Sequence, residues 1–288
     1  MGWWSYYALL FVLLSLGAMT ARAQNLYVAE LDIGTVSMIT PGGVVTPFVT
    51  GLNFPTSLSF DASGNMYESD NETDSVNKIT PGGTVTLFAA FPGGSNPYDS
   101  AVDSSGNLFV NLNAANEIDK VTPSGVISTF LTGTGETSQL VIDPSNNLYL
   151  PDGTFNNIDK VTPGGVETTF ATGISGAMGF NGNILYVANN TGIYEISPAG
   201  VVTTFLLGDY SGGENLAFDS SGNLYYSNFS TGDVYEVTTG GVSSVFASGL
   251  SQPLGVAFAP PIPEPGSVAM LVGGLGMLGL VVGRRRAS

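Results

Sequence analysis

The stretch LAFDSSGNLYYSNFSTGDVYEVTTGGVSSVF, residues 216–246, contains the unit from which the middle of the chain is built. A short apolar segment (216–218) ends at Asp219, and a Gly-Asn turn leads into an aromatic strand that begins at Leu224. The next strand, 234–237, alternates apolar and polar residues, as expected when one face of a strand is buried. A Gly-Gly turn then leads to a strand that ends at Phe246. The stretch therefore predicts four short strands joined by tight turns.

This unit recurs six times between residues 24 and 260. The aromatic residues of its second strand lie 37 to 42 residues apart: Tyr27, Tyr67, Phe109, Tyr149, Tyr186 and Tyr225. Its fourth strand carries a phenylalanine in every copy: Phe48, Phe88, Phe130, Phe170, Phe205 and Phe246. Because the aromatic residues of the second strand recur in every unit, we expect them in the core. Six units of four strands predict an all-β fold, a six-bladed β-propeller with four-stranded blades.

The two ends of the repeat distinguish a closed ring from a β-solenoid, which is the alternative and needs two capping ends. The chain enters at the second strand of a unit, at Asn25, and leaves after a sixth copy of the first strand, Val256–Phe258. Neither end is a whole unit, but together they complete one. The sequence therefore predicts a propeller whose last blade is closed by both termini.

Residues 1–23 have the features of a secretory signal peptide, so the propeller is expected to occupy residues 24–259. An apolar run leads to Ala21 and Ala23, which form an A-x-A site for signal peptidase. Met1–Tyr7 contains no Lys or Arg, which is atypical. A buried N-terminal helix or an uncleaved anchor is the alternative.

The C-terminus combines a stiff spacer with an apolar segment. Residues 260–265 are rich in proline, which fixes φ and keeps the chain extended. Gly266–Gly283 follows without a charge, and as a helix it would be about 27 Å long, close to the thickness of a bilayer core. Arg284, Arg285 and Arg286 come next and would stay in the cytoplasm. We therefore predict a C-terminal transmembrane helix with an arginine tail over residues 266–288.

Pro263-Glu264-Pro265, the apolar span and the terminal arginines resemble, in this order, a PEP-CTERM sorting signal. The resemblance implies a Gram-negative bacterium that makes exopolysaccharide. It also implies export, a transient inner-membrane anchor, and release by an exosortase-type protease to the cell surface or extracellular matrix. A plain tail anchor that is never cut is the alternative.

The repeats resemble NHL-type and virginiamycin-B-lyase-type propellers, which share the Asp, the Gly-Asn turn, the aromatic strand and Thr-Pro-Gly-Gly. This scaffold is used by enzymes and binding proteins alike. The lyases are thought to use a His and Mg²⁺ at the central pocket, but this chain has no His, so that machinery cannot be transferred to it. The lack of Cys and His also excludes disulfides, thiolate nucleophiles and Ser-His-Asp triads.

The charge of the repeat region is strongly negative, with 22 acidic residues against three lysines between residues 24 and 260. This balance argues against nucleic-acid binding. In a propeller, the loops after the second and fourth strands share one face. We assign half of the acids and no lysine to these loops: Glu30, Asp32, Glu68, Asp70, Glu72, Asp74, Asp99, Glu136, Asp152, Asp209 and Glu214. This face either attracts cations or serves only solubility.

Asp70, Glu72 and Asp74 place carboxylates at alternating positions, which suits hard-oxygen coordination of Ca²⁺. The EF-hand pattern is incomplete, because Ser75 stands where glycine is needed and Gly82 stands where a bidentate Glu is needed. Ca²⁺ is therefore a weak cofactor candidate here, and a solvated hairpin loop is favoured.

Aromatic residues also lie in these loops: Phe54, Phe91, Tyr98, Phe155, Tyr210 and Phe229. Aromatic rings beside Asn and Asp are typical of sugar-binding clefts. Packing beneath their own loops is the favoured interpretation.

These features favour an exported, non-enzymatic surface or matrix propeller associated with exopolysaccharide, which binds polysaccharide, cations or another protein. The alternative is a metal-dependent lyase or hydrolase acting at the central pocket. A structural component of the matrix without a specific ligand is the third hypothesis.

Overall fold

The structure, a computed structural model, describes residues 24–135, 137, 139–152, 155–210 and 215–261. The predicted signal peptide and the predicted membrane-spanning segment lie outside the described residues. Within these ranges, we find no helix of the length and apolar character that crossing a membrane requires.

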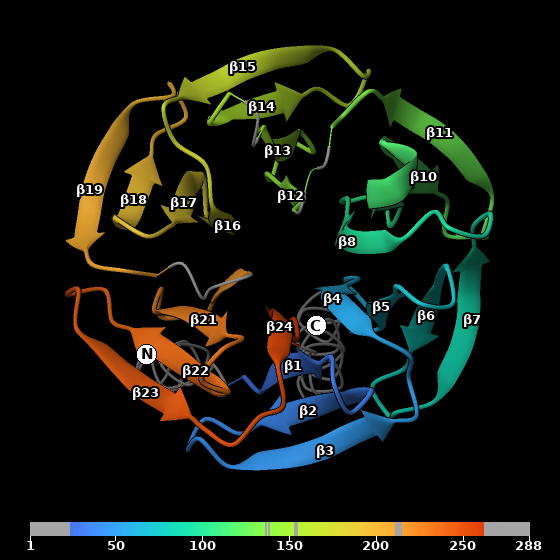
Figure 1. The fold of residues 1–288 in the computed structure, drawn as a ribbon, viewed down its shortest axis with the longest axis horizontal. Helices are drawn as coiled ribbons and strands as arrows, with labels where there is room; N and C mark the ends of the chain where they lie inside the picture. Colours follow the sequence, from blue (N-terminus) through green and yellow to red (C-terminus); the bar gives the residue numbers. More distant parts are fainter. Residues whose placement is uncertain (1–23, 136, 138, 153–154, 211–214, 262–288) are drawn as a thin grey trace, which may run out of the picture.

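Six antiparallel four-stranded sheets are arranged around a central axis (Figure 1), which confirms the predicted six-bladed propeller. The innermost strands are β24 (Pro253–Phe258), β4 (Pro55–Phe60), β8 (Pro97–Val102), β12 (Val141–Ile142), β16 (Ala177–Asn181) and β20 (Leu216–Phe218). The second strands are β1 (Leu26–Glu30), β5 (Met66–Asp70), β9 (Leu108–Leu112), β13 (Leu148–Asp152), β17 (Ile184–Ala188) and β21 (Leu224–Asn228).

The outer half of each blade repeats in the same way. The third strands are β2 (Thr35–Ile39), β6 (Ser75–Ile79), β10 (Glu117–Val121), β14 (Asn157–Val161), β18 (Gly192–Ile196) and β22 (Asp233–Val237). The outermost strands are β3 (Val45–Thr50), β7 (Val85–Ala90), β11 (Ile127–Thr132), β15 (Glu167–Thr172), β19 (Val202–Leu207) and β23 (Ser243–Ala247). A 3₁₀ turn, η1 (Asn113–Ala115), follows β9.

The ring is closed by the two ends of the described chain, as predicted. β24 pairs antiparallel with β1, with Leu26 opposite Phe258 and Val28 opposite Val256. The last strand thus becomes the innermost strand of the first blade. Closure removes the unpaired inner edge that β1 would otherwise present.

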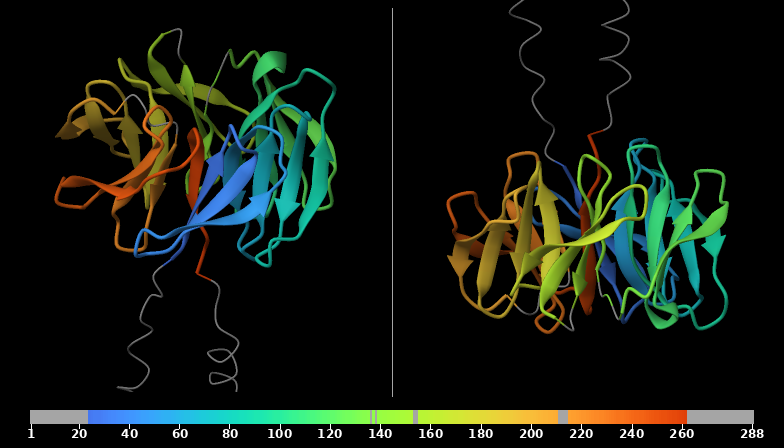
Figure 2. Two further views of the ribbon diagram at one scale, coloured as in Figure 1. Left: turned by 60° about the horizontal axis from the view of Figure 1, so that its bottom comes forward. Right: turned by 90° about the horizontal axis from the view of Figure 1, so that it is seen from above.

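The propeller has two faces, which Figure 2 shows from the side. We call one the turn face, because it carries the tight turns after the first and third strands of each blade. The other is the loop face, which carries the loops after the second and fourth strands. Because Leu26 pairs with Phe258, the first and last described strands both reach the turn face. The sequence leading to residue 261 therefore leaves the propeller there.

Pairs of aromatic rings pack within the blades and confirm the predicted core positions. Each aromatic residue of a second strand meets the phenylalanine of the fourth strand, with ring centroids 4.8 to 5.7 Å apart and the rings edge to face. Tyr67 and Tyr149 are 2% and 3% exposed. Edge-to-face pairs add about 0.5–1.5 kcal/mol each beyond the area that they bury.

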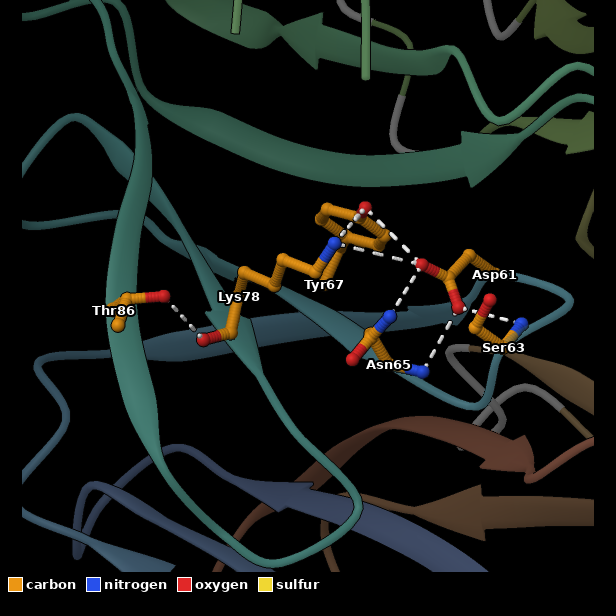
Figure 3. Close-up of polar contacts among 6 residues, drawn as sticks. All are labelled: Asp61, Ser63, Asn65, Tyr67, Lys78 and Thr86. Carbon is orange, nitrogen blue, oxygen red and sulfur yellow. Dashed lines mark hydrogen bonds and ion pairs between the residues drawn. The ribbon is translucent and has the colours of Figure 1, made fainter. Parts of the chain in front are cut away.

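A repeated polar cluster secures the first turn of most blades, and Figure 3 shows it in the second blade. Asp61 Oδ1 accepts the backbone N–H groups of Ser63 and Asn65, both at 2.9 Å, and Oδ2 accepts Asn65 Nδ2 at 2.8 Å. Lys78 Nζ lies 3.6 Å from Oδ2 and donates to the Tyr67 hydroxyl at 3.1 Å. Burial alone would raise the pKa of Asp61, but these donors outweigh it and lower the pKa.

The same cluster explains the recurring Asp-x-x-Gly-Asn motif. Asp103, Asp143 and Asp219 make the equivalent bonds to the residues two and four positions later. The residue before the Asn takes a left-handed conformation, with φ near +80° at Gly64 and +64° at Asn146, as predicted for this turn. The motif is therefore structural.

Candidate functional site

A cavity of about 280 Å³ lies on the loop face, at the mouth of the central channel. Its lining residues come from four blades, from the loops after the second strands and from the innermost strands and the segments that lead into them. They are Leu31, Phe54, Thr56, Asn71, Tyr98, Phe229 and Leu254. Three of these residues are aromatic and come from three different blades. The volume is near the lower end of the range for small-molecule sites, about 300 Å³ and above, so the cavity fits one small ring or chain end.

Phe54 is held in this cavity by an unusual backbone conformation. Its φ is +57°, a left-handed value that bulky residues rarely adopt. The equivalent positions before Pro97 and Pro253 have φ values of +52° and +48°, but they carry Asn96 and Gln252. In each case the carbonyl of the left-handed residue accepts an N–H from the loop after the second strand, such as Asn71 N–H at 3.2 Å. The left-handed backbone conformation thus recurs at the equivalent position of three blades. Among these three positions, the second blade carries the aromatic ring, which is 48% exposed.

The loops that carry these aromatics are positioned by two of the predicted metal ligands. Asp70 is 2% exposed, and its Oδ2 accepts the N–H of Asn53, the residue before Phe54, at 2.9 Å. Asp74 accepts the N–H groups of Gly94 at 2.7 Å and Asn96 at 2.8 Å. Bonds from Asn96 and Gly94 lower the pKa of Asp74. The two carboxylates therefore fix the backbone just before Phe54 and just before Pro97-Tyr98.

The third predicted ligand, Glu72, is exposed in the loop between Asp70 and Asp74. Within the residues that the structure describes, no three His, Cys, Asp or Glu side chains are grouped so that they could hold a metal ion. Ca²⁺ binding by Asp70, Glu72 and Asp74 stays a prediction.

A second, much smaller void of about 10 Å³ shares Thr56, Tyr98 and Leu254 with the cavity and extends inward from it. Ser57, Asp99 and Asn215 complete most of its polar lining, and its volume suits about one water molecule. The cavity thus has an aromatic rim and a narrow polar floor.

Asp99 is the ionisable group of this floor. It is 4% exposed, and its two oxygens accept N–H groups from Ser100 and Leu140, each at 2.8 Å. Leu140 belongs to the next blade, so the carboxyl also links adjacent inner segments. Burial raises the pKa of Asp99 to about 7, because it penalises the charged form more than these bonds favour it.

Glu68 is a second buried acid, and its predicted place in a loop was wrong. It lies in the middle of β5, fully buried, where one oxygen accepts Asn77 Nδ2 at 3.0 Å and the other has no partner. Burial raises its pKa to about 8. The equivalent residues of the other second strands are apolar or aromatic: Val28, Val110, Leu150, Val187 and Tyr226. Comparison of the six units at this position would have revealed it.

The assignment of acids to loops was wrong for five residues, which lie in strands: Glu30, Glu68, Asp70, Asp99 and Asp152. The polar residues at the ends of these strands had been assigned to the adjoining loops. Glu30, Asp70 and Asp152 are still at the loop-face ends of their strands. The lysines lie elsewhere, on third strands near the turn face, and each is packed over an aromatic ring: Lys78, Lys120 and Lys160.

The six loop aromatics have different environments. Phe54, Tyr98 and Phe229 line the cavity. Phe91 and Tyr210 are 8% and 9% exposed and pack beneath their own loops, as the favoured interpretation predicted. Phe155 is 71% exposed and is not part of the cavity lining.

Comparison with known proteins identifies the C-terminus and the fold. Residues 261–286 match the PEP-CTERM protein-sorting motif, which includes Pro263, Glu264, Pro265 and Arg284–Arg286. No curated protein matches the sequence.

Several solved structures share the fold. The propeller of a nidogen/laminin complex superposes with a TM-score of 0.73 at 18% identity and covers 83% of this chain and 99% of that one. A catalytically inactive virginiamycin B lyase from Staphylococcus aureus, solved with quinupristin, gives 0.62 at 16% identity, over 85% and 94% of the two chains. A gluconolactonase from Xanthomonas campestris gives 0.62 at 14% identity, over 71% and 79%.

These identities are low, so the likeness establishes the fold alone. The protein is a six-bladed β-propeller similar to those of virginiamycin B lyases and NHL-type proteins. It carries a PEP-CTERM sorting motif at its C-terminus, which marks it as an exported protein handled by that sorting system.

Proposed function

We propose that the protein is a non-enzymatic binding protein of the cell surface or extracellular matrix, and that it binds polysaccharide in the cavity at the channel mouth. The observation that carries the proposal is the convergence of Phe54, Tyr98 and Phe229 from three blades on one cavity. Aromatic rings offer an apolar platform to the face of a sugar ring. Asn71 adds an amide group for hydrogen bonds to sugar hydroxyls.

The position of the cavity supports this proposal. The chain leaves the propeller from the turn face toward the sorting motif, whereas the cavity is on the loop face. A propeller held by its C-terminus would therefore present the cavity away from the membrane, toward extracellular polymer.

Binding is tested by titrating the secreted protein with neutral oligosaccharides in a calorimeter. Phe229→Asn is the informative variant, because Asn71 and Asn113 already occupy the equivalent position in other blades. We expect it to weaken binding about tenfold, which corresponds to loss of one stacking contact of about 1.4 kcal/mol. Phe155→Ser removes an exposed ring outside the cavity and should leave affinity unchanged. Equal effects of the two variants, or no binding to any glycan, would contradict the proposal; the second result would favour a purely structural matrix role.

We further propose that the chain is processed at both ends, by signal peptidase after Ala23 and by an exosortase-type protease at Pro263-Glu264-Pro265. The sorting motif supports the C-terminal cut. The intact mass of the secreted form should correspond to a chain from Gln24 to between residues 263 and 266. Replacing the three residues with alanines should retain the full-length protein in the membrane fraction. A secreted form that still carries Arg284–Arg286 would instead indicate an uncut tail.

Metal-dependent lyase or hydrolase activity is the second candidate, and Asp99 is the observation that favours it. A carboxyl with a pKa near 7 is suited to general acid–base catalysis at neutral pH. Chain cleavage of a polysaccharide, dependent on added divalent metal and abolished by Asp99→Asn, would establish this function. Binding without cleavage would support the non-enzymatic role.

A further inference from the structure

The charge around the cavity narrows the class of sugar that it can take. Described acids on or near the loop face are Glu30, Asp32, Asp70, Glu72, Asp74, Asp99, Glu117, Asp152, Asp209 and Asp233. The lysines do not compensate them there. Lys78 and Lys160 pair with Asp61 and Asp143 near the turn face, at 3.6 and 3.9 Å. Charges of one sign around a concave site attract ligands of the opposite sign.

Three of these acids lie close to the cavity. Asp32 and Glu72 are exposed, and each directly follows a lining residue, Leu31 or Asn71. They therefore put negative charge on the rim. Asp99 lies in the wall of the small void that continues inward from the cavity.

The aromatic rings reinforce the same preference. The face of an aromatic ring carries negative electrostatic potential, so it attracts a cation as well as an apolar sugar face. Phe54 is 48% exposed and is kept at a backbone conformation that is unfavourable for phenylalanine, so the fold holds this ring at the cavity. A polymer of uronic acids would meet repulsion at the rim, whereas a protonated amine would meet carboxylates and ring faces.

We propose that the cavity binds amino-sugar residues with a free, protonated amine: the sugar ring lies against Phe54, Tyr98 and Phe229, and the ammonium group faces the carboxylates of the rim. This inference rests on the proposed polysaccharide binding and specifies its substrate class. It predicts that acetylation of the amine, which removes the charge, weakens binding.

The test compares three tetramers at mildly acidic pH, where the sugar amines are protonated, and at low ionic strength: β-1,4-linked glucosamine, its N-acetylated form, and galacturonate. Two opposite charges about 4 Å apart in water attract by about 1 kcal/mol, which is roughly a fivefold effect on affinity. We therefore expect the glucosamine tetramer to bind at least about fivefold more tightly than the acetylated one, and galacturonate to bind weakest. Added salt should reduce the difference, since it screens exposed charges.

Charge variants assign the effect to the cavity rim. The double variant Asp32→Asn, Glu72→Gln should lower the affinity for the glucosamine tetramer about fivefold and leave the acetylated tetramer unaffected. Glu167→Gln is the control for lost charge, because it removes one exposed carboxylate from the outermost strand β15. It should leave the preference intact.

The outcomes separate this inference from the proposed function. Equal affinity for the glucosamine and acetylated tetramers, with Phe229→Asn still weakening both, would overturn the amino-sugar preference and keep polysaccharide binding. Tightest binding of galacturonate would also overturn it. Absence of binding to all three tetramers would overturn both. A preference for glucosamine that Glu167→Gln reduces as much, per charge removed, as the double rim variant would show attraction by net charge alone, which contradicts a specific site.

Discussion

The turn face and the loop face are built from the same six repeats, but they differ in how strictly the repeats are kept. On the turn face, Asp61, Asp103, Asp143 and Asp219 make the same bonds to the same turn positions. On the loop face, one backbone position carries Phe54, Asn96 or Gln252 although its left-handed conformation is shared. Repetition thus marks residues that hold the ring together, and departures from it mark residues free to serve a ligand.

The two faces should therefore respond differently to substitution. Changes on the turn face should lower stability and leave binding intact, while changes at the cavity should do the reverse.

Deletion of residues 253–258 should have the largest effect, because it removes the innermost strand of the first blade. β1 would lose its partner and expose an unpaired edge at the centre of the ring. We expect aggregation or loss of a cooperative thermal transition, followed by circular dichroism. An unchanged melting curve would contradict ring closure by both termini.

Asp61→Ala should destabilise the propeller by about 2 kcal/mol, because it removes charge-assisted bonds to two backbone N–H groups, Asn65 and Lys78. Urea denaturation measures the loss, and Glu167→Gln serves as the exposed-carboxylate control. Glycan affinity should not change. A variant with wild-type stability, or one with impaired binding, would break the contrast between the faces.

Glu68 should make stability depend on pH between about 5 and 8. Its pKa is about 8 in the folded protein, above its ordinary value, so the folded state holds a proton that the unfolded state has lost. The free energy of unfolding should therefore fall as pH rises through this window, by up to about 1.4 kcal/mol per pH unit. Asp99, with a pKa of about 7, contributes in the same direction up to about pH 7.

Glu68→Gln should reduce that slope, since the amide keeps the shape and hydrogen-bonding capacity of the side chain but does not ionise. Urea denaturation at a series of pH values compares the two proteins. If both lose stability equally between pH 5 and 8, Glu68 does not carry its proton into the folded state.

Ca²⁺ should have a small effect on stability if Asp70, Glu72 and Asp74 bind it. Millimolar Ca²⁺ would raise the melting temperature by linkage, and Asp70→Asn with Asp74→Asn would remove the rise. Mg²⁺ at the same concentration is the control for ionic strength. No shift with Ca²⁺ would leave Asp70 and Asp74 with their backbone bonds alone.

The repeated part of the fold could be predicted because each signal occurs six times. The aromatic pairs, the Asp-x-x-Gly-Asn turns and the incomplete ends predicted the core, the turns and the closure. The starting residues of the innermost strands were harder to predict. β24 begins at Pro253, three residues before the segment Val256–Phe258 from which it was predicted, because proline is tolerated at the first residue of a strand.

The candidate site could be predicted only in part. Phe54, Tyr98 and Phe229 belonged to a set of six loop aromatics, and composition does not separate them from Phe91 or Tyr210. What separates them is backbone direction, which depends on one left-handed residue and on hydrogen bonds that backbone N–H groups donate to distant acids such as Asp70. Those long-range bonds leave no local pattern in the sequence.

Phe54→Asn tests the central claim most directly, because it exchanges a cavity residue for the residue that Asn96 supplies at the equivalent position. Asn adopts a left-handed φ more readily than Phe, so we expect the free energy of unfolding to be unchanged or to rise by up to about 1 kcal/mol. Affinity for the glucosamine tetramer should fall about tenfold, as for loss of one ring contact. Measured together by urea denaturation and calorimetry, preserved stability with lost binding is the predicted result. Lost stability with preserved binding would contradict the account, because Phe54 would then serve the fold.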